Sequence, residues 1–200
     1  MNRLSFNMSF KQMKVNGIIL AGGKSTRMGQ DKGLIQWKGK YLLEYPLSTL
    51  LSVCETCIIS ANDTQYQQFN LPLIEDIYKD IGPIGGLHAA LDSTKDCWNV
   101  VLSCDVPFID TNVVERLLQH IGSDVECVVA VHNGQFEPLV TVFHSSVASK
   151  LEDYIMLKEY NIRHIIRQLK YAEVDFSKEE ILNPALFQNI DTPEDLEKLQ

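Results

Sequence analysis

Basic residues are few in this 200-residue chain, where 18 Lys and Arg stand against 26 Asp and Glu and the formal net charge is −8. This balance argues against a general binder of nucleic acid or anionic membrane, although a local basic cluster can still hold a phosphate. The chain also lacks an apolar run near the ~20 residues that cross a membrane, and its start lacks the continuous apolar segment of a secretory signal. We therefore expect a cytoplasmic protein whose partners include neither nucleic acid nor a membrane.

Cysteine is scarce, and the five cysteines do not have the spacing of a disulfide framework. Cys54 and Cys57 form a lone C-x-x-C pair. A redox pair of this kind normally follows a strand and opens a helix, whereas this pair runs into a strand-like segment. A zinc site would need a second pair. We predict buried thiols in a reducing compartment.

Several common catalytic motifs are missing as well. No serine stands in a G-x-S-x-G nucleophile elbow, and the five histidines form no H-x-x-x-H or Cys/His cluster. The residues Gly23-Lys24-Ser25 imitate the end of a P-loop, but the first glycine of that motif would fall at Ile18. The dinucleotide fingerprint G-x-G-x-x-G is absent too. We interpret the histidines as structural and look elsewhere for the site.

From Val15 onward, strand patterns alternate with helix patterns. The predicted strands are Val15–Leu20, Cys57–Ser60, Leu71–Ile74, Trp98–Cys104, Glu126–Val131, Leu139–Phe143 and Ala172–Phe176. The predicted helices are Leu42–Val53, Leu87–Leu91, Asn112–Ile121, Val147–Leu157 and Ile162–Leu169, and a last helix starts at Thr192 as N-cap with Pro193 in its first position. This alternation predicts an α/β fold with a mostly parallel sheet and helices on both faces. We expect one domain over residues 15–200 after a disordered extension, residues 1–14.

The loop after the first strand is the most informative stretch, because Leu20–Lys32 reads LAGGKSTRMGQDK. Gly22 and Gly23 permit close approach of a ligand, and the amides of such a loop can converge on phosphate oxygens. Three cations fall within nine positions of this otherwise acidic chain: Lys24, Arg27 and Lys32. The combination predicts a site for a triphosphate.

Two carboxylates follow other predicted strands. Asp76 comes after Leu71–Ile74, where Pro72 indicates a strand start or an edge strand, and Asp105 comes directly after Trp98–Cys104. Ligands collect at the carboxyl ends of strands in open α/β sheets, so we expect these residues and the first loop to meet over one crevice. Asp105 is well suited to coordinate Mg²⁺, which prefers carboxylate, phosphate and water oxygens.

Six ordered pieces of the chain resemble a known family. LAGGKSTRMGQDK closely resembles the signature L-A-G-G-x-S-x-R-M-G-x-D-K of the molybdenum cofactor guanylyltransferase family. The resemblance continues through ISAND at 59–63, IED at 74–76, GPIGGL at 82–87, CDVPFI at 104–109 and NIDTPEDL at 189–196. It runs from Val15 to the end of the chain. The implied fold is the three-layer, Rossmann-like nucleotidyltransferase fold.

The resemblance implies transfer of GMP from GTP to the phosphate of molybdopterin, with release of pyrophosphate and with Mg²⁺ as cofactor. The implied GTP contacts are Leu20, Ala21, Gly22, Lys32, Asp76 and Asp105, and the implied catalytic residues are Arg27, Lys32 and Asp105. Asp105 is the implied metal ligand, and Asp191 is a second candidate. Some relatives carry Asn where this chain has Ser60, a departure that puts one nucleotide contact in doubt. Molybdopterin-handling proteins and molybdoenzymes are the implied protein partners.

Two alternatives stay open from the sequence. A related nucleotidyltransferase of the same fold would use CTP or a sugar phosphate, and a protein that kept the fold without catalysis would only bind nucleotide. The second glycine of LAGG and the Asp31-Lys32 pair favour guanylyl transfer over cytidylyl transfer. The intact Arg27, Lys32 and Asp105 favour an enzyme over a binding protein.

Overall fold

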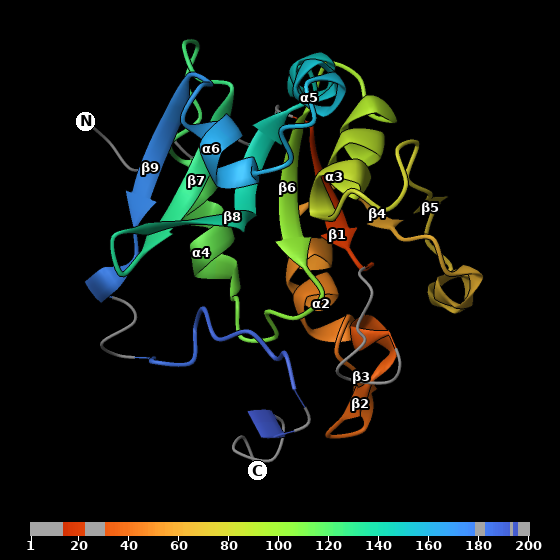
Figure 1. Ribbon diagram of the computed structural model, residues 1–200. Coiled ribbons are helices and arrows are strands. Elements are labelled where there is room, and N and C mark those ends of the chain that lie inside the picture. The colour runs from red at the N-terminus through yellow and green to blue at the C-terminus, as the bar shows by residue number, and fades with distance from the viewer. Residues whose placement is uncertain (1–13, 23–30, 179–182, 193, 196–200) are drawn as a thin grey trace.

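A seven-stranded sheet forms the centre of the computed structural model, which describes residues 14–22, 31–178, 183–192 and 194–195 (Figure 1). The strands lie in the order β5-β4-β1-β6-β8-β7-β9. Their bounds are β1 Val15–Leu20, β4 Thr56–Ser60, β5 Leu73–Ile74, β6 Trp98–Ser103, β7 Cys127–His132, β8 Gln135–His144 and β9 Tyr171–Asp175. The extension predicted over residues 1–14 lies outside the described residues except for Lys14.

One strand runs against the others. β8 pairs antiparallel with β6 and β7, while the four other pairings of the sheet are parallel. The prediction of a mostly parallel sheet is therefore confirmed. β8 begins at Gln135 rather than at the predicted Leu139, because the turn residues Asn133 and Gly134 both have positive φ and close a tight hairpin with β7.

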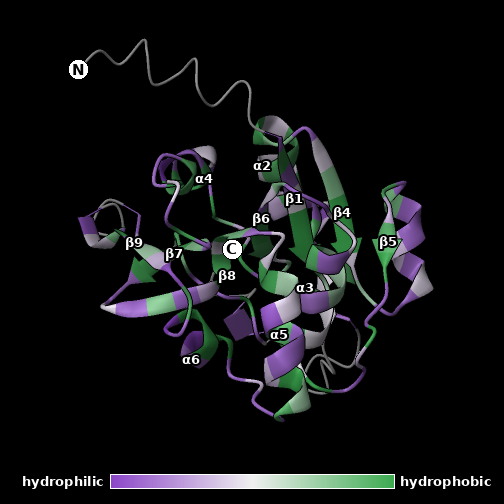
Figure 2. Ribbon diagram, turned by 90° about the horizontal axis from the view of Figure 1, so that it is seen from above, coloured by the Kyte–Doolittle hydropathy of each residue, from purple (hydrophilic) through white to green (hydrophobic). Residues whose placement is uncertain are grey.

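Helices cover both faces of the sheet, as predicted. α2 (Glu44–Val53) and α4 (Thr111–Leu118) lie on one face, and α3 (Pro83–Asp92), α5 (Val147–Met156) and α6 (Ile162–Ile166) lie on the other (Figure 2). Within the described part of the chain, no helix has the length and apolar character needed to cross a membrane.

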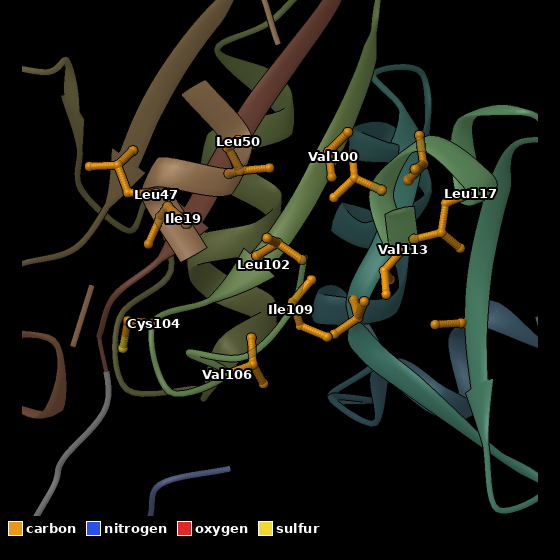
Figure 3. Packing of buried hydrophobic residues seen from close by; sticks show 14 of the residues in the cluster. Ile19, Leu47, Leu50, Val100, Leu102, Cys104, Val106, Ile109, Val113 and Leu117 are labelled. Carbon is orange, nitrogen blue, oxygen red and sulfur yellow. The ribbon is translucent and has the colours of Figure 1, made fainter. Parts of the chain in front are cut away.

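The core divides into two layers because successive side chains of a strand point to opposite faces. Ile19 packs beside Leu50 of α2, and Leu117 of α4 belongs to the same layer farther along the sheet (Figure 3), whereas Ile18 packs in the layer beneath α3 and α5. Strand β6 is buried on both faces, which explains its nearly continuous apolar sequence. Burying each such aliphatic side chain contributes about 1.5–3 kcal/mol, so the central strands are held firmly in place.

Several element boundaries differ from the sequence prediction. α3 begins at Pro83, four residues earlier than predicted, because Gly82 takes φ +78 and Pro83 has the fixed φ that suits a first helical turn. β5 is shorter than predicted and lies at the sheet edge, as Pro72 indicated, and α6 ends at Ile166. Four short elements had no sequence signal: β2 (Gln36–Trp37), β3 (Lys40–Tyr41) and the 3₁₀ helices η1 (Lys32–Leu34) and η2 (Thr64–Phe69).

The C-x-x-C pair lies at the end of α2 and the start of β4, and all five cysteines are free. Burial raises the pKa of Cys54 to about 12 and that of Cys57 to about 11. Only about one thiol in a thousand, or fewer, would then ionise at pH 8, and the thiolate is the reactive form. We expect a maleimide to label both thiols slowly in the native protein and rapidly in guanidinium, as followed by mass spectrometry. Rapid native labelling of Cys57 would contradict this prediction.

Candidate functional site

The carboxyl ends of β1, β4, β5 and β6 share one edge of the sheet, which lies toward the β2–β3 hairpin in Figure 1. A cavity of about 740 Å³ opens at this edge. Its lining includes Leu20, Gly22, Asp31, Ser60, Asn62, Asp63, Asp76, Asp80, Pro83 and Gly86. The volume falls within the ~300–1,000 Å³ of typical small-molecule sites. We call it the large cavity.

Backbone hydrogen bonds align the strand ends that form the large cavity. The Ala21 amide donates to the Ser60 carbonyl at 2.9 Å, and the Ala61 amide donates to the Ile74 carbonyl at 3.0 Å. Ser60 itself is buried at the end of β4. These bonds extend the parallel pairing one residue past each strand, so the loops that follow leave the sheet side by side.

Asp76 lies against the first turn of α3, where two glycines make room for it. A Cβ on Gly85 would lie 3.2 Å from Asp76 Oδ2, and a Cβ on Gly86 would lie 3.3 Å from Oδ1 and 2.6 Å from Ser60 Oγ. Burial raises the pKa of Asp76, while the Asn62 side chain opposes that rise. The Asn62 amide oxygen also accepts from the Asp76 backbone N–H at 3.0 Å. The GPIGGL segment thus packs closely against the Asp76 carboxylate, and larger side chains at Gly85 and Gly86 would crowd it.

Lys32 holds two carboxylates together next to the large cavity. Its Nζ contacts Asp105 Oδ2 at 3.2 Å and forms a second ion pair with Asp191. Burial alone would lower the pKa of Lys32, but the hydrogen bonds and charges of Asp191 and Asp105 outweigh it and the pKa is raised. Lys32 therefore stays charged at neutral pH. The side chain of Asp105 is 16% exposed and that of Asp191 is 50% exposed, so this cluster is open to a ligand.

The C-terminal segment reaches Asp105 through its backbone. The Ile190 amide donates to the Asp105 carbonyl at 2.9 Å, which brings the next residue, Asp191, to the Lys32 ammonium group. Thr192 acts as the predicted cap, since its Oγ1 accepts from the Asp195 amide at 3.3 Å while Asp195 Oδ2 accepts from the Thr192 amide at 3.0 Å. Pro193 and the helix expected beyond residue 195 lie outside the described residues.

A smaller cavity of about 300 Å³ lies on the other side of Asp105. Its lining includes Pro83, Ser103, Asp105, Glu137, Tyr160, Asn161, Arg163 and Asn189. Pro83 lines both cavities, and the Asp31-Lys32 dipeptide spans them, because Asp31 lines the large cavity and Lys32 contacts Asp105. The two cavities therefore adjoin at Pro83, and the Lys32 cluster lies beside the Asp105 wall of the smaller one.

The predicted site residues separate into two groups. Leu20, Gly22 and Asp76 line the large cavity, and Ala21 is buried beneath it, whereas Asp105 lines the smaller cavity with Lys32 beside it. In the described part of the chain, the expected crevice consists of two adjoining cavities that share Pro83, and β4 and β1 lie between β5 and β6 in the sheet. Arg27 lies outside the described residues.

Several polar residues that line the two cavities were not identified from the sequence. Asn62 and Asp63 belong to the quoted ISAND segment and directly follow a strand, a position that could have marked them. Asp80 and Arg163 stand in segments without a recognisable motif. Nothing local in the sequence marks these polar residues, because only the folded chain brings them to the cavities.

The donor set of the Lys32 cluster suits a hard divalent ion. Within the described ranges, no group of three or more His, Cys, Asp or Glu side chains is arranged to hold a metal. Asp105 and Asp191 nevertheless converge on one cation, the Lys32 ammonium group. Two carboxylates completed by phosphate and water oxygens are typical of protein Mg²⁺ sites. The residues present therefore fit Mg²⁺ bound together with a phosphate ligand.

Comparison with known proteins identifies relatives over most of the chain. The model of the MobA-like NTP transferase domain matches residues 17–174. The molybdenum cofactor guanylyltransferase of Vibrio cholerae is 37% identical over 90% of this chain and 88% of its own length, and that of Photobacterium profundum is 34% identical over 90% and 93%. The crystal structure of molybdopterin-guanine dinucleotide biosynthesis protein A from Archaeoglobus fulgidus has a TM-score of 0.76 at 26% identity, covering 92% of this chain and 95% of that one.

Proposed function

The chain belongs to the MobA-like NTP transferase family, and on this premise we propose that it transfers GMP from GTP to the terminal phosphate of molybdopterin. The products would be molybdopterin guanine dinucleotide and pyrophosphate. The observation that carries the proposal is the Lys32 ammonium group, which Asp105 and Asp191 hold beside two adjoining cavities. A transferase of this kind has to bring a nucleotide and an acceptor to one charged centre.

GTP fits the large cavity with its base near Asp76. Guanine offers two adjacent donors, N1–H and the exocyclic amine, which a carboxylate can accept with both oxygens. Asp76 is half-buried and fixed against Gly85 and Gly86, so it provides such an acceptor in a defined place. Cytosine instead offers an amine next to an acceptor, which a carboxylate matches poorly. This chemistry supports guanine as the base.

The triphosphate would extend from the large cavity toward Lys32. The Lys32 charge would neutralise the phosphate oxygens, and we keep Arg27 as a second cation for the leaving pyrophosphate. Asp105 and Asp191 would hold Mg²⁺. When bound there, Mg²⁺ would stabilise the negative charge on the reacting phosphate oxygens.

Molybdopterin fits the smaller cavity, which has Asp105 in its wall and Arg163 as a cation for a phosphate. The Arg163 Nε donates to the Phe136 carbonyl at 2.9 Å, so its guanidinium is anchored to β8. An oxygen of the molybdopterin phosphate would attack the α-phosphorus of GTP, and the bond from that phosphorus to the β-phosphate oxygen would break. In-line transfer would require the attacking oxygen and the leaving oxygen to lie on opposite sides of the α-phosphorus.

The proposed reaction needs no general base, because the attacking phosphate is already an anion. This agrees with the chemistry of the Lys32 cluster, which offers a cation and carboxylates rather than an activated serine or cysteine. The chain's own contribution is alignment and charge neutralisation. Molybdopterin-handling proteins and molybdoenzymes remain the proposed partners for supply and delivery.

Selective binding of GTP tests the proposal. We expect GTP with Mg²⁺ to raise the melting temperature by about 5–10 °C at a ligand concentration of ~100 Kd, since ligand binding to the native state stabilises it by mass action. ATP, CTP and UTP should give smaller shifts, and omission of Mg²⁺ should reduce the shift with GTP. Differential scanning fluorimetry with the four nucleotides provides the measurement.

The variant Asp76→Asn serves as the matched test of base recognition, because it keeps the side-chain shape and removes one acceptor oxygen. It should reduce the GTP shift toward that of the other nucleotides. A shift with CTP equal to or larger than that with GTP in the native protein would overturn the guanylyl assignment.

A further inference from the structure

A buried tyrosine contacts the segment that carries Lys32. The Tyr66 hydroxyl of η2 donates a hydrogen bond to Asp31 Oδ1, and the same oxygen accepts from the Gly33 amide at 3.2 Å. Tyr66 and Asp31 are 35 positions apart in the sequence. The carboxylate of Asp31 thus closes the turn around Lys32 on one side and joins it to η2 on the other.

Tyr66 cannot touch a ligand in either cavity. Its side chain is fully buried, at 0% exposure, and it belongs to the core layer that contains Ile19 and Leu50. Its ring also lies 6.1 Å from that of Phe69, centroid to centroid, within the same short helix. Packing in the core therefore fixes the position of the hydroxyl, and its hydrogen bond to Asp31 fixes the turn that carries Lys32.

The turn is fitted closely to the tyrosine. A Cβ on Gly33 would overlap the Tyr66 hydroxyl, so only glycine leaves room for this contact. The Leu43 amide donates to the Gly33 carbonyl at 3.2 Å, and the Ile35 amide donates to the Lys32 carbonyl at 3.1 Å. Backbone bonds therefore hold the end of the turn, while Asp31 and Tyr66 hold its beginning.

The same short helix forms part of the large cavity. η2 begins after Asp63, whose Oδ1 accepts from the Gln65 amide at 2.8 Å, and both Asp63 and Thr64 line the cavity. Asp31 lines the large cavity as well. Tyr66 therefore connects the wall of the large cavity to the turn that carries Lys32.

We propose that Tyr66 is a positioning residue, which holds the Lys32 ammonium group at Asp105 and Asp191 through its hydrogen bond to Asp31. Lys32 has a long, flexible side chain, and restricting its backbone lowers the entropy lost when the ammonium group binds phosphate. The inference rests on the proposed function, because it assigns Lys32 to the nucleotide phosphates. It adds a buried residue, outside both cavities, to the determinants of the reaction.

The variant Tyr66→Phe removes the hydroxyl and keeps the ring in the core. We expect kcat/KM for GTP to fall about tenfold, because hydrogen bonds to charged groups contribute a decade or more to an equilibrium. KM for GTP should rise along with the fall in kcat, since Lys32 would bind the phosphates in both the ground state and the transition state. Steady-state kinetics should be run well below the melting temperature of each variant.

Tyr45→Phe is the matched control. The Tyr45 hydroxyl also donates to a buried partner, the Trp37 carbonyl at 2.7 Å, but it makes no contact with Asp31. Both variants should lower the melting temperature, and only Tyr66→Phe should change kcat and KM. Equal kinetic parameters in the two folded variants would overturn the positioning role and leave Tyr66 a structural residue.

A double-mutant cycle identifies the route through Lys32. In a Lys32→Ala background, Tyr66→Phe should cost no further kcat/KM, because the group that it positions is gone. If the loss of kcat/KM in the double variant equals the product of the losses in the two single variants, the proposal is overturned. If the wild-type protein fails to use GTP, the proposed function fails, and the same cycle is measured as affinity for whichever nucleotide stabilises the protein most. Additive losses in that measurement would also overturn the inference.

Discussion

Asp105→Asn is expected to lower turnover by a factor of about 100 or more while the protein stays folded, because metal-assisted charge stabilisation contributes several kcal/mol and each decade of rate corresponds to about 1.4 kcal/mol. Asn keeps the size of the side chain and an oxygen that can accept from Lys32, and the backbone carbonyl still accepts from Ile190. It loses the negative charge on which a Mg²⁺ site depends. The damage should therefore fall on kcat more than on GTP affinity.

Turnover of Asp105→Asn should be measured across a Mg²⁺ titration, with circular dichroism and the melting temperature as checks of folding. Asp153→Asn is a matched control, since Asp153 is an exposed residue of α5 outside both cavities. The control should keep wild-type turnover. Near-normal turnover of Asp105→Asn at every Mg²⁺ concentration would show that Asp105 is not the metal ligand, and Asp191 or Asp76 would have to take that role.

Lys32→Ala should reduce GTP affinity and kcat together, with kcat/KM falling by about 100-fold, because a cation near phosphate stabilises both the bound nucleotide and the charge that develops during transfer. The variant also leaves Asp105 and Asp191 facing each other without their shared cation. Two carboxylates without a neutralising charge attract a divalent ion more strongly. Mg²⁺ alone should therefore stabilise Lys32→Ala more than it stabilises the wild-type protein.

Calorimetric titration with GTP and melting curves with and without Mg²⁺ test both parts of this prediction. Lys95→Ala removes an exposed lysine between α3 and β6, at the opposite end of β6 from Asp105, and should behave as wild type. Adding Asp191→Asn to Lys32→Ala should remove the extra stabilisation by Mg²⁺. An unchanged GTP affinity in Lys32→Ala would place the triphosphate elsewhere than at this cluster.

The local pattern of apolar residues was sufficient to predict the bounds of β1 and β6, the strands that precede the first loop and Asp105. β1 agrees with its predicted range, and β6 ends one residue earlier than predicted. Both are short, mostly apolar runs followed by residues that break a strand, a pattern that depends on burial alone and not on the identity of the neighbouring strands. Because ligands gather at strand ends, the positions of Leu20, Asp76 and Asp105 at one edge of the sheet followed from the same pattern.

The contacts among polar residues depended on the path of the folded chain. Lys32 and Asp191 meet across 159 positions, and the strand order places β4 and β1 between β5, which precedes Asp76, and β6, which precedes Asp105. Periods of 2 and 3.6 residues report which side chains are buried, but they carry no information about which distant polar groups come together. Tyr66 illustrates the difference, because nothing near it in the sequence indicates that its hydroxyl bonds to the carboxylate beside Lys32.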